Sequence, residues 1–205
     1  MKKFFLEIVV FVCGSVVMAY EIIGSRMLGP NVGTSYEVWT SIIGIILLSL
    51  SLGYYFGGKI SDNRPSASLL AGIIVSAGLF ILISSFVKDA LAGFFLNHLT
   101  SLPLVSIIIS LLLFSVPAFL LGMVSPFAAR LKIKSVHTSG YTVGYLYAIS
   151  TIGSITGTFL AGFYLIPAFR ITVILVILAA VLLFFSIILY IVYKDSLIHH
   201  SNSQT

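Results

Sequence analysis

Two ionisable residues, Glu21 and Arg26, lie within an otherwise apolar stretch that covers residues 4–28. A charged side chain at the centre of a membrane helix costs about 2.5–3.5 kcal/mol by insertion scales, so it usually faces a bundle interior or a wet cavity. There, the Glu21 carboxylate could bind a cation or carry a proton. It could equally be a buried tie, hydrogen-bonded to a serine, threonine or tyrosine of a neighbouring helix. The sequence leaves both interpretations open.

Glu21 belongs to a stripe along this helix. Glu7, Gly14 and Glu21 are seven residues apart, and a seven-residue step drifts by only about 20° on a straight helix, so all three share one face. Arg26 lies five residues beyond Glu21, about 140° around the helix, which is poor geometry for pairing. We expect Arg26 to reach the outer membrane surface or to pair with Glu37. Glu7, close to the inner surface, is expected to be solvated.

The elements that position this stripe are membrane helices. Of 205 residues, 59% are hydrophobic and 8% charged, and the mean hydropathy is +1.16, values that exclude an ordinary soluble domain. About 20 apolar residues cross a bilayer. We therefore predict an all-α protein in which residues 1–195 form one six-helix transmembrane domain and residues 196–205 a flexible, polar cytoplasmic tail. The six predicted segments are roughly 4–28, 38–58, 67–87, 104–126, 141–166 and 171–193.

The positive charges predict how the helices are oriented. Eight of the eleven Lys and Arg residues fall on the side of the two termini, whereas only Lys88 and Arg170 fall on the other. By the positive-inside rule, both termini are cytoplasmic. We expect a multi-pass protein of the prokaryotic cytoplasmic (plasma) membrane, with the lipid bilayer and not nucleic acid as its partner. The single cysteine, Cys13, is expected to be a buried apolar residue.

Small residues mark the segment 141–166 as a packing helix. Ser150, Gly153 and Gly157 fall on one face, and Gly144 and Gly162 fall on roughly the opposite face. Small residues let helices approach closely in lipid, so two such faces predict neighbours on two sides. Segments 67–87 and 171–193 are apolar all round and are expected at the periphery. The glycines expected in helix packing are Gly14, Gly144, Gly153, Gly157 and Gly162.

The stretch "GKISDNR", residues 58–64, resembles the loop between helices 2 and 3 of the major facilitator superfamily. Its aspartate can pair with an arginine across the cytoplasmic gap. The residues expected in charge pairing or gating are Arg26, Glu37, Asp62, Arg64 and Arg130.

A second resemblance covers about residues 10–167. The segments "EIIGSRMLGPNVGTS", "GMVSPFAARL" and "GYLYAISTIGSITGTFLAGFYLIP" resemble the membrane domain of the fused spermidine synthase-like (polyamine aminopropyltransferase) membrane proteins. The soluble synthase domain of that family is missing from this sequence. There is no HExxH or GxSxG motif either, so we expect no enzyme activity, no cofactor and no metal site.

Two functions remain after these exclusions. Two copies related by a twofold axis would reproduce the two six-helix halves of a major facilitator transporter. This homodimer would have a central cavity for a polyamine or related cation, held by charge and cation–π attraction. The residues expected to line the cavity or bind substrate are Glu21, Ser25, Tyr20, Trp39, Tyr54, Tyr145, Tyr147, Ser150 and Thr151. The alternative is a non-transporting membrane anchor, which docks a separate soluble spermidine synthase-like enzyme on a basic surface formed by Arg130, Lys132, Lys134 and His137.

Overall fold

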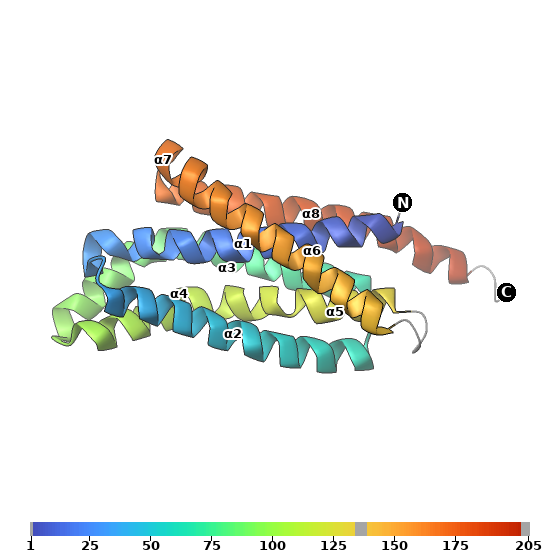
Figure 1. Ribbon diagram of the computed structural model, residues 1–205, viewed down its shortest axis with the longest axis horizontal. Helices are drawn as coiled ribbons and strands as arrows, with labels where there is room; N and C mark the ends of the chain where they lie inside the picture. The colour runs from blue at the N-terminus through green and yellow to red at the C-terminus, as the bar shows by residue number, and fades with distance from the viewer. Residues whose placement is uncertain (1, 134–138, 202–205) are drawn as a thin grey trace.

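The computed structural model describes residues 2–133 and 139–201, and within these residues the chain is helical and contains no strand (Figure 1). Lys134 and His137 of the predicted basic surface lie outside the described residues. The elements in chain order are α1 (Lys2–Val32), α2 (Tyr36–Asn63), α3 (Ala67–His98), α4 (Leu102–Gly122), α5 (Val124–Lys132), α6 (Ser139–Leu160), η2 (Ala161–Leu165), α7 (Ile166–Ala168) and α8 (Ile171–Ser201).

Six of the described segments are long and apolar enough to cross a membrane, as the sequence predicts. They cover Phe4–Val32, Tyr36–Asn63, Ala67–His98, Leu102–Lys132, Ser139–Ala168 and Ile171–Tyr193. The start of α1 and the end of α8 lie at the same end of the bundle (Figure 1), which we call the N-end. The helices are longer than the predicted segments, because the apolar core is only their central part. The last helix, for example, continues to Ser201.

Two of the crossings are interrupted, which the sequence analysis did not predict. The segment predicted at 104–126 breaks at Met123 between α4 and α5. Pro126 explains the break, because it has no N–H to bond the carbonyl of Gly122 and its ring crowds that carbonyl. The segment predicted at 141–166 passes through the π-helical turn η2, which ends two residues before Pro167.

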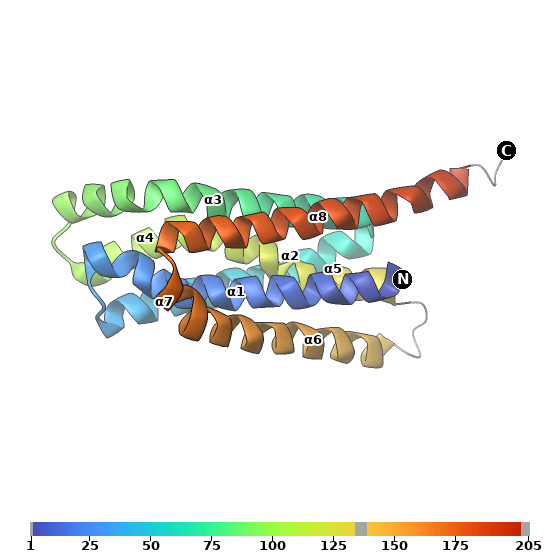
Figure 2. The ribbon, with the colours of Figure 1, turned by 90° about the horizontal axis from the view of Figure 1, so that it is seen from above.

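The closest packing joins three pairs of helices: α2 with α4, α1 with α6, and α3 with α8. Helix α1 also contacts α2, α3, α4, α5 and α8, so it is the central element. Seen from above, α3 and α8 lie along one edge of the bundle and α6 along the opposite edge (Figure 2).

Only one small-residue face of α6 packs within the chain. A Cβ atom added to Gly153 would overlap the backbone of Phe11, and one added to Gly157 would overlap the backbone of Ser15. On the other face, a Cβ added to Gly144 or Gly162 would meet, beyond its own stretch of helix, no atom of the described residues within 4 Å. The prediction of neighbours on two sides is therefore wrong for the single chain: α6 lies at the edge of the bundle, and among the described helices α1 and α5 pack closely against its α-helical part.

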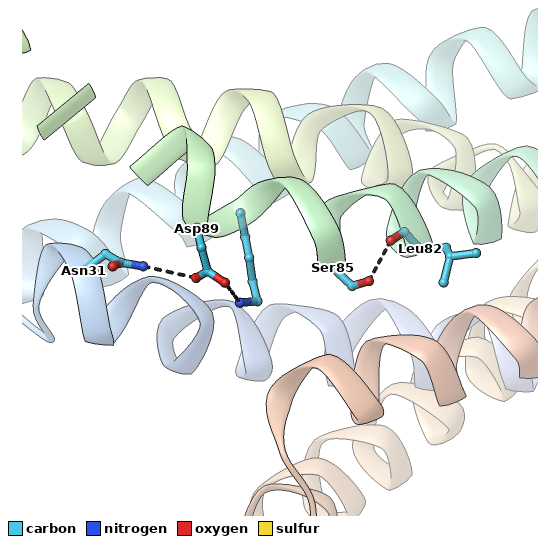
Figure 3. A network of polar contacts seen from close by, with 5 residues as sticks. Asn31, Leu82, Ser85 and Asp89 are labelled. Atoms are coloured by element: carbon cyan, nitrogen blue, oxygen red, sulfur yellow. Dashed lines mark hydrogen bonds and ion pairs between the residues drawn. The ribbon is translucent and has the colours of Figure 1, made fainter. Parts of the chain in front are cut away.

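A polar contact joins α1 and α3 at the end of the bundle opposite the N-end. The Asn31 side-chain amide donates to Asp89 over 3.3 Å, and Asp89 also pairs with its neighbour Lys88 (Figure 3). The nearby Ser85 hydroxyl instead bonds the carbonyl of Leu82 within its own helix.

Candidate functional site

The stripe on α1 has a different environment at each of its three positions. At the N-end, Glu7 accepts hydrogen bonds from Lys132 of α5 and from the Tyr145 hydroxyl of α6, the latter over 3.1 Å. The Glu7 and Lys132 side chains are only 13% and 18% exposed, and the Lys132 ammonium lies 4.6 Å from the centre of the Tyr145 ring. The prediction of a solvated Glu7 is therefore wrong: this carboxylate ties three helices together.

At Gly14, the stripe borders a small polar cavity of about 30 Å³, which we call the slot. The Ser154 hydroxyl donates to the carbonyl of Gly14 over 3.3 Å, and the Ser125 hydroxyl donates to the Ser150 hydroxyl over 3.4 Å. Both bonds are long. With Tyr54 of α2 also in its lining, the polar residues of the slot come from four elements: α1, α2, α5 and α6. Its lining includes Cys13, Gly14, Tyr54, Ser125, Ser150 and Ser154.

Glu21 lies two helical turns further along α1, about 10 Å from Gly14 by helical rise. It is partly buried and, within the described part of the chain, forms no ion pair or hydrogen bond. Helix α1 contacts the π-helical turn η2 of the neighbouring crossing. Extended by six residues, the register of Phe11 with Gly153 and of Ser15 with Gly157 places Glu21 level with η2. π-helical turns are frequent at functional sites.

Arg26 does not neutralise Glu21. Its side chain is exposed, and neither Glu21 nor Glu37 forms an ion pair with it among the described residues. The predicted alternative, an Arg26–Glu37 pair, is therefore not formed in the structure.

Two of the residues predicted to line a cavity are instead packed in the core. Tyr20 is 1% exposed, its hydroxyl bonds the Leu113 carbonyl over 3.0 Å and Ser84 over 3.1 Å, and its ring contacts Phe114 edge-on. Ser25 is 3% exposed and donates to the carbonyl of Ile22 in its own helix. Tyr20 is one residue from Glu21, hence about 100° around α1, so it faces α3 and α4.

The remaining aromatic residues do not form one wall. The Tyr54 and Tyr147 rings meet edge-on, with centres 6.4 Å apart. Tyr145 donates its hydroxyl to the Glu7 carboxylate. Trp39 is partly buried near the start of α2, about 22 Å from Tyr54 by helical rise. Thr151 is exposed, and its hydroxyl bonds the Tyr147 carbonyl of its own helix.

A second cavity, of about 190 Å³, lies nearer the N-end, and we call it the vestibule. Its lining includes Gly58, Asp62, Pro126, Arg130 and Tyr147. Asp62 of α2 and Arg130 of α5 form an ion pair over 3.1 Å at its rim, with side chains 72% and 43% exposed.

Arg64 and Glu37 lie outside the slot and the vestibule. Arg64 follows α2 as its C-terminal cap and forms no ion pair among the described residues. Glu37 borders a larger, mostly apolar groove of about 430 Å³ between α2 and α4, at the end opposite the N-end.

Sequence reasoning missed four residues that build the site. Ser125, Ser154 and Cys13 line the slot, and Lys132 binds Glu7. The available signal was Pro126: a helix break there turns α5 so that its residues reach α1, α2 and α6. No cluster of three or more His, Cys, Asp or Glu residues suited to a metal ion occurs among the described residues.

Comparison with known proteins adds no identity. No family model, no curated protein and no solved structure matches the chain.

Proposed function

We propose that this chain is a small membrane transporter that works as a homodimer and carries an organic cation, with a polyamine or related amine as the substrate class. The observation that carries the proposal is Glu21, a partly buried carboxylate without a partner in the described chain, on the same face of α1 as the slot. A carboxylate kept within a membrane helix without a partner needs a cation or a proton to offset its charge.

The exposed faces of two helices support a second copy as the partner. The crossing that contains α6 is the least buried of the six: 22% of an apolar stretch of 18 residues is buried, against 33% to 50% for the same length in the other five. Large apolar side chains cover the exposed faces of α2 and α6, among them Leu48, Leu52, Ile155 and Phe159. Tyr54 of α2 and Tyr147 of α6 also contact each other beside the slot. A second copy, related by a twofold axis and packed on these faces, would therefore enclose the slot.

The pairing of α1 with α6, α2 with α4, and α3 with α8 is compatible with one half of a major facilitator transporter. The cluster of Lys59, Arg64, Arg130 and Lys132 at the N-end supports a cytoplasmic position for that end and for both termini. A prokaryotic cytoplasmic membrane is the corresponding location.

The alternative, an anchor for a separate synthase, has weaker support. Of the basic residues proposed for docking, Arg130 is paired with Asp62 and Lys132 with Glu7. Both charges are therefore already partly offset within the chain, which weakens their attraction for an acidic partner.

A binding experiment tests the proposed substrate class. Purified full-length protein in detergent is incubated with radiolabelled putrescine, and the bound fraction is measured by scintillation proximity. Saturable binding is expected for the wild type, with at least a tenfold loss in Glu21→Gln and substantial retention in Glu21→Asp. The matched control is Glu37→Gln, which removes a carboxylate far from the slot and should bind as the wild type. Equal binding by Glu21→Gln and the wild type would refute the assignment.

A further inference from the structure

The slot and the vestibule follow one another along the same three helices. On each helix, the nearest residues that line the two cavities are at most four positions apart. The neighbours are Tyr54 and Gly58 on α2, Ser150 and Tyr147 on α6, and Ser125 and Pro126 on α5. The two cavities are therefore stacked along the axis of the bundle, with the vestibule nearer the N-end.

Two tyrosine rings lie at the boundary between these cavities. Tyr54 lines the slot, Tyr147 lines the vestibule, and their rings meet edge-on at 63°. The two residues are 42% and 37% exposed, so neither ring is fixed by a surrounding core. Side chains of this kind change rotamer on fast timescales. The close approach of α6 to α1 is made at other residues, Gly153 and Gly157.

We propose that the slot and the vestibule are two compartments of one pathway for a primary ammonium group, with the Tyr54–Tyr147 ring contact as the gate between them. The proposal rests on the proposed function, because it specifies how a cation reaches the face of α1 that carries Glu21.

The chemistry of the slot selects this class of ligand. The hydroxyls of Ser125, Ser150 and Ser154 offer acceptor lone pairs, and no cationic side chain lines the slot among the described residues. The bond between Ser125 and Ser150 and the bond from Ser154 to the Gly14 carbonyl are both long, so an ammonium with three donors can replace or add to them. The volume of about 30 Å³ suits a single water-sized group. The two rings at the gate favour a cation over an anion.

The chain contains its own probe of this pathway. Cys13 is its only cysteine, lines the slot and is 3% exposed. Methanethiosulfonate ethylammonium carries a primary ammonium group. It converts a thiolate to a mixed disulfide and releases methanesulfinate, so the rate of the mass increase reports access to the slot. The measurement uses purified full-length protein in detergent and mass spectrometry, with Cys13→Ser as the blank.

Opening the gate should increase this rate. We expect slow labelling in the wild type and in Tyr147→Phe, which keeps the ring, and at least tenfold faster labelling in Tyr147→Ala. Tyr55→Ala is the matched control, because Tyr55 is an exposed tyrosine of α2 that lines neither cavity. It should label as the wild type. If Tyr147→Ala does not elute as a folded protein, Tyr54→Ala removes the other ring and carries the same expectation.

Two further comparisons test the route and the ligand class. A Cβ added to Gly58 meets no atom within 4 Å, so Gly58→Leu in the Tyr147→Ala background should fill the vestibule and return the rate toward that of the wild type. In Tyr147→Ala, the anionic ethylsulfonate reagent should react at least tenfold more slowly than the ammonium reagent, once each rate is divided by its rate with glutathione.

The proposal is overturned by an unchanged rate in the alanine variants, by a fast rate that Gly58→Leu does not reduce, or by equal rates for the two reagents. These outcomes are separate from the proposed function. Gated labelling without putrescine binding would retain the pathway and reject the polyamine class, whereas binding with ungated labelling would reject the gate alone.

Discussion

Replacement of Gly157 by alanine tests whether α6 is held against α1 by close backbone approach. The added Cβ would overlap three backbone atoms of Ser15. None of these is the movable end of a side chain, so the two helices must separate locally. Overpacking of this kind costs about 1–3 kcal/mol. Against it stands a gain of up to about 1 kcal/mol, because alanine favours a helix over glycine.

The same substitution at Gly144 provides the control. Gly144 is in the same helix, and its added Cβ would meet no atom within 4 Å, so this variant receives the helix-propensity gain without the overlap. The difference between the two variants therefore isolates the overlap, at about 1–3 kcal/mol in favour of Gly144→Ala. Gly72→Ala, on α3 with equally open surroundings, controls for any effect of Gly144 on dimerisation.

The difference can be measured by reversible unfolding in mixed micelles of mild detergent and sodium dodecyl sulfate. Trp39, the only tryptophan, supplies a fluorescence signal on α2, remote from either substitution. Gly157→Ala should unfold at a lower fraction of dodecyl sulfate than both controls. Coincident transitions for Gly157→Ala and Gly144→Ala would refute the inferred packing of α6 on α1.

Three further predictions concern the polar contacts. Lys132→Met leaves the mostly buried Glu7 carboxylate without its cation and should destabilise the protein by about 3 kcal/mol. Adding Glu7→Gln to this variant should recover part of the lost stability. If the losses of the two single variants simply add in a double-mutant cycle, the ion pair between Lys132 and Glu7 is contradicted. Tyr20→Phe removes a hydroxyl that bonds Leu113 and Ser84 and should cost about 1–2 kcal/mol in the same unfolding assay. A stability equal to that of the wild type would show that these two hydrogen bonds are absent. Asp62→Asn should change stability by less than about 1 kcal/mol, because the pair with Arg130 is largely exposed; a loss above 2 kcal/mol would show that it is buried in the assembled protein.

Hydropathy was enough to predict the six crossings, because each one needs a long apolar run whatever its neighbours are. Hydropathy does not predict which side chains meet between helices. Lys132 and Glu7 are 125 residues apart in the chain, and their pairing depends on how α5 turns after Met123. Nothing in the local sequence of Glu7 indicates that partner, although Pro126 indicates that the helix must break nearby.

For the aromatic residues too, the local sequence does not identify the neighbouring side chains. Periodicity places Tyr20 beside Glu21, but it does not say which side of α1 faces the core and which faces the slot. The two small-residue faces of α6 could likewise be read from the sequence, but not which of them packs on α1. Such choices depend on the whole arrangement of helices, in which α1 is surrounded by others and α6 lies at an edge (Figure 2).

Uptake into proteoliposomes is the most direct test of the central claim, that Glu21 serves the movement of an organic cation across the membrane. Wild-type protein, Glu21→Gln and the control Glu37→Gln are reconstituted at equal density, and accumulation of radiolabelled putrescine is followed against protein-free vesicles. The account predicts uptake by the wild type and by Glu37→Gln, with at least a tenfold loss in Glu21→Gln. Uptake by Glu21→Gln at the wild-type rate, or none above protein-free vesicles with the wild type, would contradict it.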